Sequence, residues 1–305
     1  MAQARVGIGM PVFNGERFLA HAIEGVLTQD FADVELIIAD NASTDATVEI
    51  SQAFASQDRR VRVLRSDTNR GLAWNFNRVF EASSAEYFMW NAADDSRLPG
   101  MVKSCVTRLD DAPDAALCST GVVYIDEYGD EIKRWPLTGR ASAAGSVERF
   151  RDVVLNELEC LPAHGVIRSA ALRRTALHGG YPSSDNPLLA ELALHGRFLE
   201  VEEYLTYRRD FAGRSMRQFK TPKERTTFFD PSRAGAITLP RWRIGAEYVR
   251  AVRRADLSAA DRAACLPGIG PWAVKHRRPL VRNVGSAGRE ITRRALIAGR
   301  SRVAH

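Results

Sequence analysis

The sequence has few cysteines and no long apolar run. Its four cysteines form no C-x-x-C pair and are scattered at Cys105, Cys118, Cys160 and Cys265. This argues against a disulfide framework or a zinc site, and it fits a reducing cytoplasm best. No stretch approaches the roughly 20 apolar residues that span a bilayer, and the first residues, MAQARVGIGMPVFN, lack the features of a secretory leader. We therefore expect a soluble or peripheral protein.

A complete dinucleotide-binding fingerprint is also missing. Gly7 and Gly9 lie in a short apolar run at 5–12, but Val12 stands where the third glycine is required. What the sequence does have is 305 residues with 45% hydrophobic content. That is enough to bury a substantial core, in one large α/β domain or in two smaller ones.

Charge is distributed unevenly along the chain. The net charge is +6, but residues 214–305 contain 21 Lys and Arg against 6 Asp and Glu, so residues 1–213 are net acidic. A basic segment can bind nucleic acid, or an anionic membrane surface at about 1 kcal/mol per well-placed charge. It can also be a solvated helical face, or pack on the acidic body.

Strands and helices alternate in the first hundred residues. Apolar runs predict strands at 5–12, 34–39, 61–64 and from 87 toward 94, and helical spacing predicts helices at 16–27, 46–54 and from the loop at 69–71 through 80. This order predicts a mainly parallel sheet with helices on both faces. Ligands bind beyond the carboxyl ends of such strands, which here carry Asn14, Asp40, Arg70 and Asp94.

The stretch YFMWNAADDSRLP, at 87–99, is an apolar run that ends at two adjacent carboxylates, Asp94 and Asp95. Neighbouring carboxylates repel each other, so they are favourable mainly where a cation or several hydrogen-bond donors absorb the charge. The alternative is that they cap the helix expected from Met101. Beyond that helix, which we expect to end near 109, the pattern predicts a strand at 115–125, a turn at 126–130, a polar loop at 136–146, and helices at 147–158 and 187–195.

Four blocks occur in order on these elements: MPVFNGERFLAHAIEGVLTQDF, VELIIADNASTDAT, NRGLAWNFN and WNAADD. Together they resemble the family 2 glycosyltransferases of the GT-A fold, over residues 5–213. The resemblance implies an inverting, metal-dependent transfer of a sugar from a nucleotide-sugar to an acceptor. It also implies a GT-A domain at 1–213, with a nucleotide-binding half at 1–99 and an acceptor half at 100–213. Residues 214–305 would then form a basic, mainly helical extension.

The resemblance also assigns roles to residues. It implies nucleotide contacts from Pro11, Val12, Phe13, Asn14, Glu16, Asp40, Asn41, Arg70, Gly71 and Asp94. Asp40 would accept a hydrogen bond from the base, which suits the N–H of uracil or thymine. Arg70 would offset phosphate charge. Glu16 can instead be a first-turn acid favoured by the helix dipole, and Asp45 is best interpreted as a helix cap.

The metal motif departs from the family pattern. The usual Asp-x-Asp-Asp is Ala92-Ala93-Asp94-Asp95 here, so the first carboxylate is missing. Mg²⁺ or Mn²⁺ would be held by Asp94 with Asp95. Because magnesium keeps waters and takes only one or two protein carboxylates, such a site is chemically acceptable, with weaker affinity expected.

In the second half of the chain, Asp185 resembles the family's catalytic base, which takes a proton from the acceptor hydroxyl. It can also cap the helix that follows. His164, Arg208 and Arg214 are candidate contacts to acceptor or diphosphate. The alternatives are a structural histidine and, for these arginines and Arg209, an exposed basic surface.

The expected function is transfer of a sugar from a UDP- or dTDP-sugar to a glycan or lipid-linked acceptor. An alternative is a non-catalytic nucleotide-sugar binding protein, because Ala92 replaces the first carboxylate of the metal motif. A nucleotidyltransferase normally has a glycine-rich, basic first loop, whereas this one reads MPVFNGE. The basic extension suggests peripheral docking at the inner face of an anionic membrane, and we do not expect nucleic acid as a partner. The donor sugar, the linkage and the oligomeric state are not encoded in any motif.

Overall fold

The computed structural model describes residues 4–156 and 161–303. Within these ranges, nine strands form one sheet in the order β3-β2-β1-β4-β8-β6-β9-β5, with β7 paired to β6. Their bounds are β1 Val6–Val12, β2 Val34–Asp40, β3 Val61–Leu64, β4 Tyr87–Trp90, β5 Ser96–Arg97, β6 Ala115–Ile125, β7 Glu131–Trp135, β8 Val166–Arg168 and β9 Arg197–Arg209.

Strands β1 to β4 are parallel to one another, as the alternation predicts. β8 runs antiparallel between β4 and β6, whereas the long strands β6 and β9 are parallel to each other. The fold class predicted from the sequence is therefore confirmed: an α/β fold of the GT-A kind with a mostly parallel central sheet and helices at its C-terminal end.

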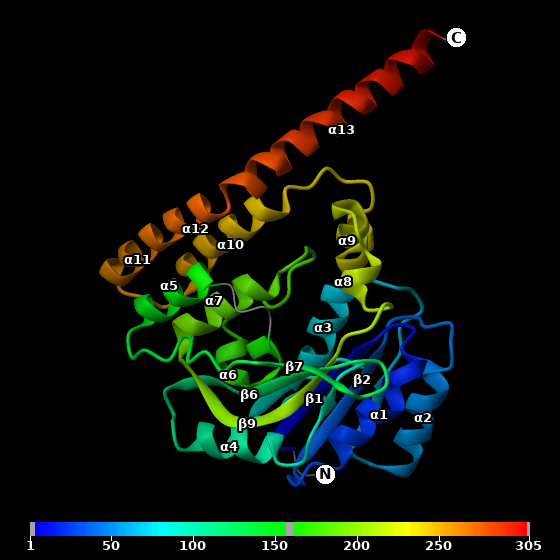
Figure 1. Cartoon of the computed structure of the whole chain (residues 1–305), viewed down its shortest axis with the longest axis vertical. Helices are drawn as coiled ribbons and strands as arrows, with labels where there is room; N and C mark the ends of the chain where they lie inside the picture. Colours follow the sequence, from blue (N-terminus) through cyan, green and yellow to red (C-terminus); the bar gives the residue numbers. More distant parts are fainter. Residues whose placement is uncertain (1–3, 157–160, 304–305) are drawn as a thin grey trace.

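Helices cover both faces of the sheet (Figure 1). They are α1 Glu16–Leu27, α2 Thr47–Gln57, α3 Leu72–Glu81, α4 Met101–Asp110, α5 Ser146–Asn156, α6 Ser169–Leu172, α7 Asp185–His195, α8 Ser215–Gln218, α9 Pro222–Phe229, α10 Pro240–Arg254, α11 Ala259–Cys265, α12 Ile269–Lys275 and α13 Arg277–Val303. One core contains side chains of α1 and α4, and the other contains side chains of α3, α5, α7, α10 and α12. The carboxyl ends of β1, β2 and β4 open between these layers.

The aromatic strand β4 lies at the centre of both cores. All four residues of YFMW are buried, and they alternate between the faces as a strand requires. Trp90 contacts Phe88 and Phe80, and its indole Nε1 donates to the backbone oxygen of Phe76 at 2.8 Å. This packing fixes the point at which the chain leaves the sheet toward Asp94.

Several predicted boundaries shift slightly. The second helix begins at Thr47 and not at 46, where Asp45 accepts a hydrogen bond from the Thr47 backbone nitrogen at 3.1 Å. The helix predicted at 147–158 spans Ser146–Asn156, and residues 157–158 lie outside the described ranges. The capping alternative for Asp94 and Asp95 is wrong, because the N-cap of α4 is Gly100.

Part of the basic C-terminal segment packs in the core. Tyr248 of α10 and Trp272 of α12 are buried and pack edge to face with ring centroids 5.4 Å apart. Arg254 makes two hydrogen bonds, at 2.7 and 2.9 Å, to the buried carboxylate of Glu191 in α7. Helix α13 then projects away from the body (Figure 1). None of the helices traced here is both long and apolar enough to cross a membrane.

Candidate active site

Two adjoining cavities lie at the carboxyl ends of the strands. The first, called the polar cavity, has a volume of about 540 Å³ and is lined mainly by the loops after β1 and β2 and by the segment after β9. The second, called the aromatic cavity, has a volume of about 250 Å³. The two share four lining residues, Pro11, Leu72, Arg214 and Phe228. A ligand with two chemically different parts can therefore lie across them.

Most of the residues predicted to contact a nucleotide line the polar cavity. They are Pro11, Val12, Phe13, Asn14, Glu16, Asn41 and Asp94. Three predicted contacts, Asp40, Arg70 and Gly71, do not line it, although they lie next to residues that do. The structure therefore brings seven of the ten together.

The floor of the polar cavity is held by polar cross-links between loops. Asn14 adopts a positive φ of 50°, and its side-chain oxygen accepts a hydrogen bond from the Thr44 backbone nitrogen at 2.9 Å. Glu16 and Asp45 brace the starts of α1 and α2 against each other. The Asp45 carboxylate accepts from the Glu16 nitrogen at 3.1 Å, and the Glu16 carboxylate accepts from the Ala46 nitrogen at 2.9 Å. Both acids also line the cavity, so Glu16 is at once a first-turn acid and a wall residue.

Asp40 is buried, and its carboxylate accepts hydrogen bonds from the Ser43 backbone nitrogen at 3.2 and 3.4 Å. The next residue, Asn41, faces the cavity. The Asn41 side chain accepts from the Arg70 nitrogen at 3.0 Å and donates to Asn69 and to the Gly71 carbonyl at 3.0 and 3.2 Å. Asn41 thus fixes the 69–71 loop beside the cavity.

Arg70 and Gly71 do not line the cavity, but each contacts a helix beside it. The Arg70 guanidinium lies 4.2 Å from the ring centroid of Trp74, a cation–π contact. Gly71 has a φ of 91°, and a Cβ there would lie 2.6 Å from the carbonyl oxygen of Phe229. The glycine is therefore needed for the close approach of α9, whose phenylalanines wall the cavities.

Asp94 and Asp95 follow β4 and face different cavities. Asp94 lines the polar cavity and Asp95 the aromatic one. Burial and the neighbouring Asp95 carboxylate raise the pKa of Asp94 to about 6, while Arg214 and Arg208 act in the opposite direction. Asp95 accepts a hydrogen bond from the Arg209 backbone nitrogen at 3.0 Å. Among the residues described, no group of three His, Cys, Asp or Glu side chains is placed to hold a metal ion.

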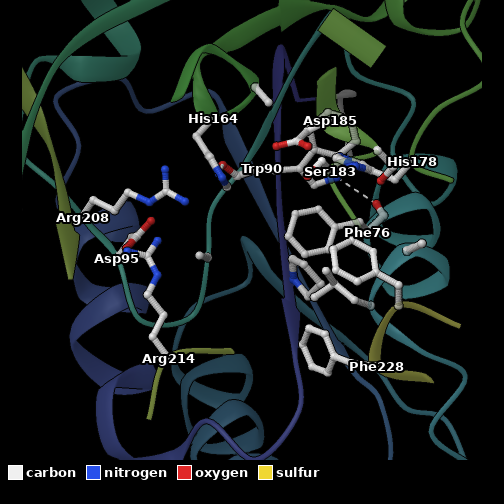
Figure 2. A pocket seen from close by; sticks show the side chains of 17 residues that line it. Phe76, Trp90, Asp95, His164, His178, Ser183, Asp185, Arg208, Arg214 and Phe228 are labelled. Carbon is white, nitrogen blue, oxygen red and sulfur yellow. Dashed lines mark hydrogen bonds between the residues drawn. The ribbon is translucent and has the colours of Figure 1, made fainter. Parts of the chain in front are cut away.

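The residues predicted for the second half of the site meet at the aromatic cavity. Asp185, His164, Arg208 and Arg214 all line it (Figure 2). Asp185 lies in the first turn of α7, whose N-cap is Ser184, so the capping alternative is not what the helix shows. Burial lowers the pKa of His164 to about 3, with Arg208 acting in the same direction, so the imidazole is neutral.

Some lining residues were not anticipated from the sequence. They are Asp45, Phe76, His178, Ser183, Ser184, Phe211, Phe228 and Phe229. Asp45 fits the interpretation as a helix cap from the sequence, but its spacing from Asp40 on one loop is a usable signal of a site residue. Phe228 and Phe229 lie in the C-terminal segment, where no local pattern indicates that α9 returns to the sheet edge.

The match to known proteins agrees with this geometry. The profile described as Glycosyl transferase family 2 matches residues 8–179, and the chain belongs to this family. It is 31% identical over 126 residues to a putative glycosyltransferase, EpsE, of Bacillus subtilis, covering 41% of this chain and 45% of EpsE. It is 24% identical over 226 residues to a second putative glycosyltransferase of that organism, EpsH, covering 73% of this chain and 60% of EpsH. The chain thus spans less than two thirds of these relatives' length.

Solved structures share the fold at low identity. Residues 1–349 of S. aureus TarS in complex with UDP-GlcNAc superpose with a TM-score of 0.67 at 14% identity, covering 94% of this chain and 81% of that one. The mannosyltransferase PcManGT from Pyrobaculum calidifontis, in complex with GDP-Man and Mn²⁺, gives 0.51 at 12% identity, covering 94% and 88%.

Proposed function

We propose that this protein is an inverting glycosyltransferase that moves a sugar from a UDP- or dTDP-sugar to a hydroxyl of a glycan or lipid-linked acceptor. The observation that carries the proposal is the placement of Asp94 and Asp185 on two adjoining cavities that share Arg214. The polar cavity would hold the nucleotide, and the sugar would extend into the aromatic cavity.

In the proposed reaction, the acceptor oxygen attacks the anomeric carbon on the face opposite the leaving group. The Asp185 carboxylate takes the acceptor proton, the new carbon–oxygen bond forms, and the bond to the diphosphate breaks with its electron pair on the diphosphate oxygen. Arg214, which lines both cavities, would offset the charge that develops there. Neutral His164 would offer a hydrogen bond without adding charge.

The proposed metal site contains only two protein carboxylates. Burial and the adjacent Asp95 carboxylate raise the pKa of Asp94, so a cation beside Asp94 would be favourable, and Mg²⁺ needs only one or two protein carboxylates when waters and phosphates complete its shell. Asp94 and Asp95 would therefore hold Mg²⁺ or Mn²⁺, which when bound supplies positive charge for the departing diphosphate. The Mn²⁺ in PcManGT supports this proposal.

The test is hydrolysis and transfer with a panel of nucleotide-sugars in Mn²⁺ or Mg²⁺. We expect Asp185→Asn to lower turnover at least about 100-fold, since general-base catalysis typically contributes that much, while UDP binding is unchanged. Asp94→Ala should weaken metal-dependent UDP binding. Asp111→Asn, at an exposed carboxylate after α4 that lines neither cavity, is the control.

A second candidate function is a non-catalytic nucleotide-sugar binding protein. The observation that favours it is Ala92, which lines the aromatic cavity where the family motif has a carboxylate. UDP binding without turnover of any donor in the panel would establish this candidate and overturn catalysis.

We further propose that α13 docks the protein on the inner face of an anionic membrane. Its sequence, at 277–303, has eight arginines and one glutamate, and Val281, Val284, Ile291 and Leu296 are exposed apolar residues among its described side chains. Co-sedimentation with vesicles containing anionic lipid should fall strongly for Ile291→Asp with Leu296→Asp. It should be unchanged for Val274→Asp, which is equally exposed but lies on α12. Equal binding of both variants would refute membrane docking through α13.

A further inference from the structure

One side of the aromatic cavity is built from rings and short apolar side chains. Figure 2 shows Phe76, Phe228 and His178 on one side, facing Asp95, Arg208 and Arg214 on the other. Leu72, Ala73 and Phe229 complete this apolar side, which we call the aromatic wall. The charged side is suited to a diphosphate, whereas the aromatic wall can only receive a group with little need for water.

His178 is held rigidly in this wall by α3. Its backbone nitrogen donates to the Asn77 side-chain oxygen at 3.0 Å, and its carbonyl accepts from the Asn77 side-chain nitrogen at 2.9 Å. The ring packs edge-on against Phe76 and Trp90, with centroids 5.1 and 4.8 Å away. The two hydrogen bonds fix the His178 backbone, and the two ring contacts hold the imidazole against Phe76 and Trp90.

The imidazole offers an unused hydrogen-bonding group. Burial lowers the pKa of His178 to about 4, so the ring is neutral at physiological pH. Its Nε2 atom is buried and has no hydrogen-bond partner, and the same is true of the Ser184 hydroxyl, which also lines the cavity. By contrast, the Trp90 indole N–H is already used by Phe76. Native proteins rarely leave buried polar atoms unpaired, so these two atoms at the cavity are available to a ligand that carries matching polar groups.

These features define the kind of sugar that fits. Resting on the proposed function, we infer that the aromatic wall selects a donor sugar bearing a methyl group, which packs on Phe76 and Phe228 while a polar group of the sugar pairs with His178 Nε2. The class includes 6-deoxyhexoses and N-acetylhexosamines. Glucose has a hydroxymethyl group where a 6-deoxyhexose has the methyl, and a hydroxyl where an N-acetylhexosamine has the acetamido group, so it would press a hydroxyl, stripped of water, against the rings. His178 is thus a specificity residue and takes no proton in the reaction.

The inference is tested by titrating the full chain, with Mn²⁺ present, with UDP, dTDP, UDP-glucose, UDP-GlcNAc and dTDP-rhamnose. Each donor's affinity is taken relative to its own nucleoside diphosphate, so the contribution of the base cancels. We expect at least one methyl-bearing donor to exceed UDP-glucose by about tenfold or more on this scale. Comparison of UDP-GlcNAc with dTDP-rhamnose shows whether the preferred methyl group belongs to an N-acetylhexosamine or to a 6-deoxyhexose.

Variants then separate the hydrogen bond from the packing. His178→Phe keeps a ring in the wall but removes Nε2, and should lose about tenfold in affinity for the preferred donor with UDP and dTDP binding unchanged. His178→Gln keeps a donor and an acceptor, and should recover part of that loss, which a purely structural role would not produce. His21→Phe, at an exposed position of α1, is the matched control.

The outcomes distinguish the two levels of the proposal. If UDP or dTDP binds but methyl-bearing donors show no preference over UDP-glucose, or His178→Phe leaves every donor affinity unchanged, the aromatic-wall inference is overturned and the proposed function stands. If neither nucleoside diphosphate binds, the proposed function itself fails and the inference fails with it.

Discussion

The carboxylate of Asp95 accepts a hydrogen bond from the backbone nitrogen of Arg209 at 3.0 Å, although 114 residues separate them. Arg209 also donates from its side chain to the Asp94 carbonyl at 3.3 Å and to the Asp126 carbonyl at 2.9 Å. The end of β9 therefore fixes the loop that carries both candidate metal ligands.

This link predicts different costs for two substitutions of Asp95. Asp95→Ala leaves the buried Arg209 N–H without an acceptor and should lower the free energy of unfolding by about 1–3 kcal/mol. Asp95→Asn retains an oxygen at the same place and should cost less. Urea denaturation monitored by circular dichroism measures both. An equal cost for the two variants would show that the hydrogen bond does not determine stability here.

The raised pKa of Asp94 predicts a pH dependence with a definite sign. Because the folded-state pKa of about 6 lies above the usual 3.8, the folded protein binds the proton more tightly than the unfolded chain. The resulting stabilisation is complete below about pH 4 and is lost as the pH rises toward 6. Asp94→Asn should flatten the dependence of the unfolding free energy on pH over this interval, as measured by denaturation at several pH values.

The same protonation should oppose metal binding. A carboxylate must lose its proton to ligate a cation, so Mn²⁺ affinity should be lower at pH 5 than at pH 7.5 by more than the change expected for an ordinary aspartate. Titration of the protein with Mn²⁺ in the presence of UDP, followed by the metal's paramagnetic relaxation of water, measures this change. Asp94→Ala should abolish it, and a pH-independent affinity would argue that Asp94 is no ligand.

Substitutions at Gly71 and Gly100 separate the effect of a close contact with α9 from the effect of a positive φ. Both have a positive φ, 91° and 94°, but a Cβ at Gly71 would meet the Phe229 carbonyl at 2.6 Å, whereas at Gly100 its nearest neighbour is Leu205 at 3.8 Å. Gly100→Ala should cost about 1 kcal/mol or somewhat more through backbone strain alone. Gly71→Ala should cost clearly more and should also weaken nucleotide binding by displacing α9. Thermal unfolding and UDP titration test both expectations.

Substitutions of two tryptophans measure how much the C-terminal helices contribute to the stability of the core. Trp272 is 2% exposed, whereas Trp242 is 51% exposed and donates its indole N–H to the Leu280 carbonyl. Trp272→Ala should destabilise the protein by about 3–5 kcal/mol, as is usual for a buried tryptophan. Trp242→Ala should cost about 1 kcal/mol or less. Similar small losses for both would mean that the segment from 214 folds separately from the body.

The sheet and the polar cavity were largely predictable because they rest on local patterns. The run VELIIAD forms β2 at Val34–Asp40, as its β-branched content indicates, and the loop from Pro11 to Asn14 follows β1. The local sequence does not show which of the two side chains, Asp40 or Asn41, faces the cavity. Adjacent residues leave a strand on opposite sides, and only the tertiary structure shows that Asp40 turns toward Ser43 while Asn41 faces the cavity.

The aromatic cavity was not predictable in the same way. Its walls come from α3, from the segment around His178 and from α9, which are far apart in the chain. Asn77 and His178, 101 residues apart, are joined by hydrogen bonds that no repeating pattern in the sequence indicates. Asp185 was found only because the order of motifs resembles a family, since its spacing alone fits an ordinary first-turn acid.

The family profile ends at residue 179, yet Arg208, Arg214, Phe228 and Phe229 all line the aromatic cavity. Within the aromatic wall, Phe76 and His178 belong to the part of the chain that the profile covers, whereas Phe228 and Phe229 lie beyond it. Under the proposed function, exchanging the segment from β9 through α9 between relatives should therefore alter the side of the cavity formed by Phe228 and Phe229 while Phe76 and His178 stay in place. The walls of this one cavity thus come from two parts of the chain, of which the family profile covers only the first.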